Sequence, residues 1–171
     1  FGVALSYVND AKKKFGIDPA FLLAIFTQES NLRANVGQCY VTDTITGNGK
    51  GANTGSPQIR VMSPTRDIPT FLEITNKLGL SYTSTRVSCW IKAYKKDGSP
   101  SGWGGAMGPA QFIPSTWKLF EKRLQSTLGH YPNTWEPEDA FMAYAMYLTD
   151  LGAIGASTSS QIKTACKYFC L

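Results

Sequence analysis

Glu29 occupies a position where a carboxyl group could act as a general acid. Leu22, Ile25 and Phe26 precede it by seven, four and three residues, so the four side chains share one helical face. Burial on this apolar stripe would disfavour the charged carboxylate and raise its pKa. A carboxyl that stays protonated near neutral pH can donate a proton to a leaving group. The alternative is a structural glutamate at the core edge, paired with a cation such as Arg33.

A second segment whose residues could take part in binding or catalysis spans residues 102–115. Its sequence is Gly-Trp-Gly-Gly-Ala-Met-Gly-Pro-Ala-Gln-Phe-Ile-Pro-Ser. Its small residues let the backbone approach a ligand closely, while Met107 and Phe112 offer apolar walls. Gln111 can hydrogen-bond an amide or a hydroxyl group, and Trp103 can stack on a sugar face. Taken alone, the segment is better explained as a tight glycine turn before a helix.

The elements that position these residues are predicted to be helices. Apolar residues at helical spacing, with Pro and Gly at the boundaries, predict helices over about 3–15, 19–32, 67–78, 114–128, 137–151 and 157–169. Period-two alternation is nearly absent, which predicts a mainly α fold. Residues 36–66 lack sustained periodicity and are too long for an idle connection, so we expect a functional loop or an irregular hairpin there rather than disorder. Residues 81–105 are also expected to be loop.

Length and charge narrow the class of protein. The chain has 171 residues, which fits one compact domain spanning residues 1–171. No apolar run is long enough for a membrane span, and no leader-like segment precedes Phe1, as expected of a processed product or an excised domain. The net charge of +5 suits an anionic polymer or simply a soluble basic protein. No nucleic-acid-binding motif is present, so we expect no nucleic-acid partner.

The four cysteines, at 39, 89, 166 and 170, suggest two disulfides and an oxidising compartment. Three pairings are possible, and we favour Cys39–Cys89 with Cys166–Cys170. The first would close a loop of about 50 residues, worth roughly 4 kcal/mol in the chain-entropy model. The alternative is four buried thiols in a reducing cytosol. A structural metal site is not expected, since there is no Cys-x-x-Cys pair and one histidine.

Combined, these motifs resemble lytic murein transglycosylases, and among them the group similar to membrane-bound lytic transglycosylase B. The resemblance rests on Glu-Ser-Asn-Leu at 29–32, on the specific string Gly-Ala-Met-Gly-Pro-Ala-Gln-Phe-Ile-Pro-Ser at 105–115, and on the helix around Asp139. It covers about residues 10–30, 102–120 and 135–170. It implies a lysozyme-like, mainly α single domain in which 36–66 is a long loop or hairpin insertion and 102–115 lines the glycan groove.

The resemblance also assigns roles to residues. The Glu that precedes Ser is the family's catalytic acid/base, which implies Glu29. The family carries Ala-x-x-Tyr-Asn on a late helix, which matches Ala165 to Phe169 with Tyr168 kept and Phe169 in place of Asn. A family serine that hydrogen-bonds the catalytic Glu aligns with Gly102, one residue after Ser101. The expected substrate-binding residues are Ser30, Trp103, Gly105, Met107, Gln111, Phe112, Tyr144 and Tyr168.

A single catalytic acid fits the reaction that the resemblance implies. Most glycosidases use two carboxylates, but among the twelve acidic residues Glu29 alone combines an apolar stripe with the motif. Seven of the others read as caps or solvated charges, namely Asp10, Asp18, Asp67, Asp97, Glu121, Glu136 and Glu138. The resemblance implies cleavage between N-acetylmuramic acid and N-acetylglucosamine in peptidoglycan, with 1,6-anhydro ends and without metal or cofactor. A monomer in the periplasm, in the cell wall or secreted is expected.

Two alternatives compete with this interpretation. The first is a hydrolytic muramidase of the same fold, in which Asp43 would hold the attacking water; the simpler role for Asp43 is that of a turn residue beside Thr42 and Thr44. The second is a glycan-binding module of impaired activity, for which the replacements at Gly102 and Phe169 leave room.

Overall fold

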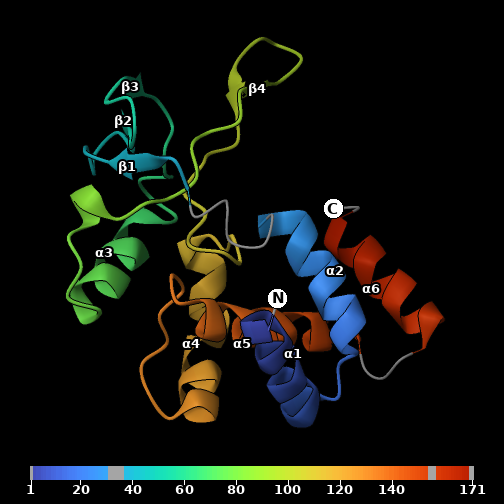
Figure 1. The fold of residues 1–171 in the computed structure, drawn as a ribbon. Coiled ribbons are helices and arrows are strands. Elements are labelled where there is room, and N and C mark those ends of the chain that lie inside the picture. The colour runs from blue at the N-terminus through green and yellow to red at the C-terminus, as the bar shows by residue number, and fades with distance from the viewer. Residues whose placement is uncertain (1, 31–36, 154–156, 170–171) are drawn as a thin grey trace.

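The computed structural model describes residues 2–30, 37–153 and 157–169 (Figure 1). Within these ranges, the side chains of residues 2–4, 26, 28–30, 164 and 166–169 are outside the description. The described helices are α1 (Gly2–Phe15), α2 (Pro19–Ser30), α3 (Ile68–Lys77), α4 (Pro114–Leu128), α5 (Pro137–Asp150) and α6 (Thr158–Phe169). They confirm the prediction of a mainly α fold, and their bounds follow the predicted ones closely.

The helix ends follow from local sequence signals. Pro114 and Pro137 open α4 and α5, because proline is pre-set for the first helical turn and needs no donor there. Helix α4 stops at Gly129, which adopts the left-handed conformation (φ 81°) and donates its N–H to the Gln125 carbonyl. These signals lie within a few residues of each boundary, which is why the sequence predicts the helices well.

Helix α5 is the centre of the helical part. It packs against α1, α2 and α4, and every side chain from Asp139 to Met146 on it is buried. Phe141 and Tyr144 of α5, Leu22 of α2 and Trp117 of α4 all lie in one core. Leu22 and Ile25 are buried as the apolar stripe of α2 predicts.

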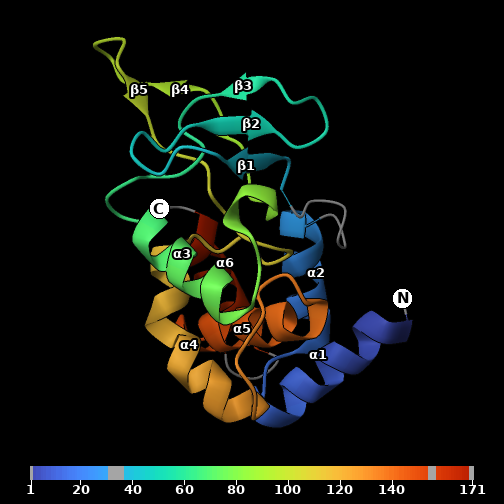
Figure 2. The same ribbon diagram turned by 90° about the vertical axis from the view of Figure 1, so that its left-hand side faces the viewer.

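The strands lie on the opposite side from α1 and α5 (Figures 1 and 2). Strands β1 (Cys39–Val41), β2 (Gly49–Gly51) and β3 (Pro57–Gln58) form an antiparallel sheet in the order β1-β2-β3. The segment 36–66 is therefore an irregular sheet from residue 39 onward. The prediction of loop over 81–105 is incomplete, since it contains a 3-10 turn (Tyr82–Ser84) and a hairpin of β4 (Ala93–Tyr94) with β5 (Pro100–Ser101). Exposed two-residue strands carry no apolar alternation that could reveal them.

A disulfide joins the sheet to the segment before β4. Cys39 and Cys89 are bonded, with their Cα atoms 5.2 Å apart, so this predicted pair is confirmed. The predicted pair Cys166–Cys170 lies outside the described residues, because Cys170 is not described and neither is the Cys166 side chain. No helix in the described part of the chain is long and apolar enough to cross a membrane.

The prediction that Asp67 is a helix cap of its own helix or a solvated charge is wrong. Its side chain is fully buried and forms no cap on α3, the helix it precedes. Instead, Asp67 Oδ1 accepts the backbone N–H of Ser115 (3.2 Å), in the first turn of α4, and Oδ2 accepts Arg66 Nε (2.8 Å). The carboxylate thus caps a distant helix and ties α3 to the end of the 102–115 segment.

The prediction that Glu121 is a cap or a solvated charge is also wrong. It lies on the buried face of α4 and is 3% exposed. Its carboxylate accepts the Tyr131 hydroxyl (2.9 Å) and pairs with Lys118 (3.4 Å). Burial and the bond to Glu121 raise the pKa of Tyr131 well above its usual range. Glu121 is therefore a structural buried acid that holds the loop after α4.

Candidate active site

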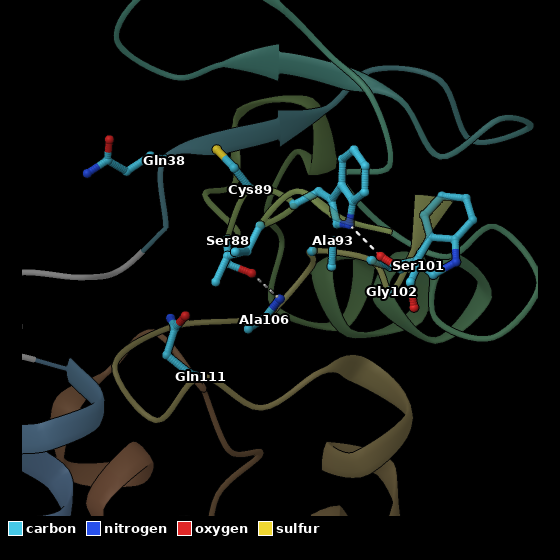
Figure 3. A pocket seen from close by; sticks show the side chains of 12 residues that line it. Gln38, Ser88, Cys89, Ala93, Ser101, Gly102, Ala106 and Gln111 are labelled. Atoms are coloured by element: carbon cyan, nitrogen blue, oxygen red, sulfur yellow. Dashed lines mark hydrogen bonds between the residues drawn. The ribbon is translucent and has the colours of Figure 1, made fainter. Parts of the chain in front are cut away.

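A pocket of about 520 Å³ opens where the 102–111 segment meets the strand region. This volume is within the range of small-molecule binding sites. Figure 3 shows Gln38, Ser88 and Gln111 at one end and Ser101 with Gly102 at the other. The described lining residues are Gln38, Ser88, Cys89, Trp90, Ile91, Ala93, Ser101, Gly102, Trp103, Gly104, Ala106 and Gln111.

The 102–115 segment forms its own small scaffold. Met107 donates its N–H to the Phe112 carbonyl (2.9 Å), which closes a loop over the residues between them. Inside this loop, Gln111 has a positive φ of 54°, unusual for a residue other than glycine. Its Nε2 donates to the Gly108 carbonyl at 2.7 Å. The loop therefore fixes both the backbone and the side chain of Gln111 at the pocket wall.

Gly108 is required by close packing within this loop. Its φ is +57°, and a Cβ at this position would lie 1.9 Å from the Thr134 carbonyl oxygen. Thr134 also donates its hydroxyl to the Met107 carbonyl (3.4 Å). The glycine in the Gly-Ala-Met-Gly string thus lets the loop touch the segment before α5.

We expect Gly108→Ala to lower the free energy of unfolding by about 3 kcal/mol, the sum of left-handed strain and a backbone clash. Chemical denaturation of the wild type and the variant measures this difference in the free energy of unfolding. Gly129→Ala is the matched control, because Gly129 also has a positive φ but nothing within 4 Å of an added Cβ. Equal losses in the two variants would show that φ alone matters and would contradict the packing argument.

The other predicted groove residues of this segment lie behind the pocket surface. Met107 and Tyr144 are fully buried, and Phe112 is 4% exposed. Phe112 packs against four rings at centroid distances from 5.0 to 6.2 Å, those of Trp117, Phe120, Tyr144 and Tyr147. Gly105 is also buried, with Met62 next to it. Of the residues predicted here, Trp103 and Gln111 line the pocket; the others support its wall, and their role toward substrate stays a prediction.

The predicted catalytic residue lies at the C-terminal end of α2. The backbone of Glu29 and Ser30 forms the last turn of that helix, and the side chains of Glu29, Ser30 and Tyr168 are outside the described part. The C-terminal ends of α2 and α6, which carry Glu29 and Tyr168, face the strand side of the molecule (Figures 1 and 2). Their catalytic and binding roles stay predictions.

Asp43 is engaged in its own turn. Its carboxylate accepts the backbone N–H of Ile45 (2.8 Å) and the hydroxyl of Thr46 (2.6 Å). These bonds, first of all that from the Thr46 hydroxyl, lower the pKa of Asp43. A carboxylate held this way stabilises the β1–β2 connection, as its simpler interpretation predicts.

Trp90, Ser88 and Gln38 line the pocket although the sequence did not indicate them. Trp90 donates Nε1 to the Ser101 carbonyl (2.8 Å), while Ser88 Oγ accepts the N–H of Ala106 (2.9 Å). The signal available was Cys89, because a disulfide between Cys39 and Cys89 brings the neighbours of both cysteines together. Gly102, aligned with the family serine, lines the pocket as well.

In the described part of the chain, no three His, Cys, Asp or Glu side chains gather in a group that could hold a metal ion. The pocket wall instead offers indole surface from Trp90 and Trp103, amides from Gln38 and Gln111, and the hydroxyl of Ser88. Such a lining fits a hydroxyl-rich ligand with apolar faces.

The helices and strands of the chain form a mainly helical domain with a lysozyme-like fold, as comparison with solved structures shows. The Escherichia coli lytic transglycosylase Slt35, in complex with bulgecin A, has 22% identity and a TM-score of 0.57, with 86% of this chain and 40% of that chain covered. Soluble lytic transglycosylase SltB1 from Pseudomonas aeruginosa has 21% identity and a TM-score of 0.58, with 89% and 44% covered. SltB3 from Pseudomonas aeruginosa, in complex with NAG-NAM-pentapeptide, has 22% identity and a TM-score of 0.58, with 89% and 35% covered.

The sequence also matches a family model. Residues 5–157 match the transglycosylase SLT domain, so the chain belongs to that family. No curated protein matches the chain by sequence. The chain spans less than half the length of the solved structures it resembles.

Proposed function

We propose that this chain is a peptidoglycan lytic transglycosylase. The observation that carries the proposal is the placement of the family motif: Trp103 and Gln111, from the 102–115 string, line a pocket on the side of the molecule to which α2 directs its C-terminal end. Glu29, in the last turn of α2, is the proposed acid/base. Membership in the transglycosylase SLT domain family supports this assignment.

In the proposed reaction, Glu29 first protonates the oxygen between N-acetylmuramic acid and N-acetylglucosamine. The bond between muramic C1 and this oxygen then breaks, N-acetylglucosamine leaves with the transferred proton on its hydroxyl, and the substrate's own acetamido group stabilises the cationic C1. Glu29, now a carboxylate, then removes the proton from the muramic C6 hydroxyl, and this oxygen closes a 1,6-anhydro ring. One acid/base residue completes both proton transfers, and water is not consumed.

The pocket residues position the glycan in this proposal. Trp103 and Trp90 offer indole faces to sugar rings, and Gln111 presents an amide fixed by the Gly108 carbonyl. The solved SltB3 structure is a complex with NAG-NAM-pentapeptide, which supports a peptidoglycan ligand for this chain. The Cys39–Cys89 disulfide fits an oxidising, extracytoplasmic location: the periplasm, the cell wall or the medium.

Asp43 is the residue on which the hydrolytic alternative depends. Both of its carboxylate oxygens accept hydrogen bonds within the turn at Thr46, and Asp43 is not among the residues that line the pocket. This engagement favours the transglycosylase over a muramidase with Asp43 as base.

Product analysis tests the proposal. We expect peptidoglycan digested by the chain to yield muropeptides with 1,6-anhydro ends, each lighter by one water than its hydrolytic counterpart, in mass spectra. Because water is not consumed, digestion in isotopically labelled water should leave these ends unlabelled. Reducing, labelled muramic ends would establish the hydrolytic muramidase. Binding of glycan without any cleavage would instead support the impaired glycan-binding module.

A further inference from the structure

Arg60 lies against the pocket end marked by Gly102. Its Nε donates to the Gly102 carbonyl at 2.8 Å. Its guanidinium carbon lies 4.1 Å from the centre of the Trp103 ring and 5.5 Å from that of Trp90. Gly102, Trp90 and Trp103 all line the pocket, so the cation is placed beside one end of it by three separate contacts.

The backbone of Arg60 is held in an unfavourable conformation. Its φ is +55°, which costs a residue with a Cβ about 1–2 kcal/mol. Asn48 Oδ1 accepts the Arg60 N–H (3.0 Å), and the Arg60 carbonyl accepts the Gly104 N–H (2.9 Å). Strain that is fixed on both sides of a residue often marks a functional position. Here it sets the direction in which the arginine leaves the backbone.

Arg60 also differs from the other arginines whose side chains the structure describes. Arg66 and Arg123 pair with carboxylates of Asp67 and Asp150, and Arg86 donates to the Asn53 side chain. Within the described residues, the two terminal nitrogens of Arg60 have neither a carboxylate nor a hydrogen-bond acceptor. A half-buried guanidinium that stacks on indoles keeps its forked donors ready for a carboxylate.

We propose that Arg60, with Trp90 and Trp103, forms a subsite for a carboxylate group of the glycan substrate. The inference rests on the proposed function, since peptidoglycan supplies carboxylates of two kinds: the lactyl group of muramic acid where the peptide has been removed, and the stem peptide where it is present. Gln111 and Gly102 lie at opposite ends of the pocket (Figure 3). The subsite therefore recognises a group at a distance from Gln111, while the indoles contact the sugar between them.

Binding of defined glycans tests the subsite, measured by calorimetry in a Glu29→Gln background that prevents turnover. Three ligands are compared: a neutral chitooligosaccharide, a peptide-free tetrasaccharide of alternating N-acetylglucosamine and N-acetylmuramic acid, and the same tetrasaccharide with stem peptides. Arg60→Asn is the test variant, because Asn tolerates a positive φ. Arg86→Asn is the matched control, an arginine near the sheet that donates to Asn53.

We expect Arg60→Asn to weaken binding of a carboxylate-bearing tetrasaccharide about tenfold, as for loss of one charge-assisted hydrogen bond. Chitooligosaccharide binding and the Arg86→Asn variant should be unaffected. Loss confined to the peptide-free ligand identifies the lactyl carboxylate, and loss confined to the peptide-bearing ligand identifies the stem. If Arg60→Asn loses affinity for the neutral chitooligosaccharide to the same extent, or loses affinity for none of the ligands, the proposed subsite is wrong. A chain that retains Arg60 and binds no glycan overturns the proposed function as well.

Discussion

We expect replacement of Glu29 with Gln to lower the rate of peptidoglycan cleavage by about 10²–10⁴-fold, the range that a general acid/base supplies. Gln has nearly the same shape as Glu but cannot donate a proton to the glycosidic oxygen or remove one from the C6 hydroxyl. Both proposed steps therefore fail in the same variant. Release of soluble muropeptides from purified wall measures the effect, and glycan binding should persist.

Two variants make this loss specific. Glu138→Gln is the matched control, since Glu138 is an exposed glutamate in the first turn of α5 and not in the pocket lining. Asp43→Asn separates the two enzymatic alternatives, because a hydrolase that uses Asp43 would lose activity with it. If the Glu29→Gln variant cleaves peptidoglycan at the wild-type rate, Glu29 is not the catalytic acid/base. Loss of activity in the Asp43→Asn variant would support the alternative function, a hydrolytic muramidase with Asp43 as base.

Local signals explain why the helices were predictable and the strands were not. Pro114 and Gly129 bound α4, and the spacing of its apolar residues is visible within the helix itself. Strand β1, in contrast, is three residues long and also bridges to Val87, far along the chain. Such pairings depend on partners that no local pattern identifies. The sequence thus predicted a functional loop or an irregular hairpin at 36–66 but not the strands after Cys89.

The same distinction applies to the candidate site. Gln111 was predicted from a contiguous motif, and the structure places it at the pocket wall. Trp90 and Gln38 reach the pocket through long-range contacts around the disulfide, so no motif indicated them. Glu121 is a different case: it was interpreted as a cap or a solvated charge, although it follows Trp117 by four residues and precedes Leu124 by three, a spacing typical of the buried face of α4. The buried Asp67 had no such signal, because its partner Ser115 is on another helix.

We expect a double substitution of Cys39 and Cys89 to Ala to lower the free energy of unfolding by about 4 kcal/mol, because a loop of this size is released in the unfolded chain. Cys39 is fully buried in β1, and Cys89 lines the pocket between Ser88 and Trp90. The backbone bonds between Cys39 and Val87 remain in the variant. The folded structure should therefore persist at moderate temperature, with a lower unfolding midpoint.

The wild-type chain itself provides the control for this loss. In reductant, the stability of the wild type should fall to that of the double variant measured in the same reductant, so that reduction of the expected Cys166–Cys170 pair is common to both proteins. Since the disulfide anchors the segment with Ser88 and Trp90, reduction should also weaken glycan binding at temperatures where this segment loosens before the helical core unfolds. A wild type whose stability is the same with and without reductant would contradict a stabilising bond. The stability of the pocket wall would then depend on hydrogen bonds such as those between Cys39 and Val87 and between Ser88 and Ala106.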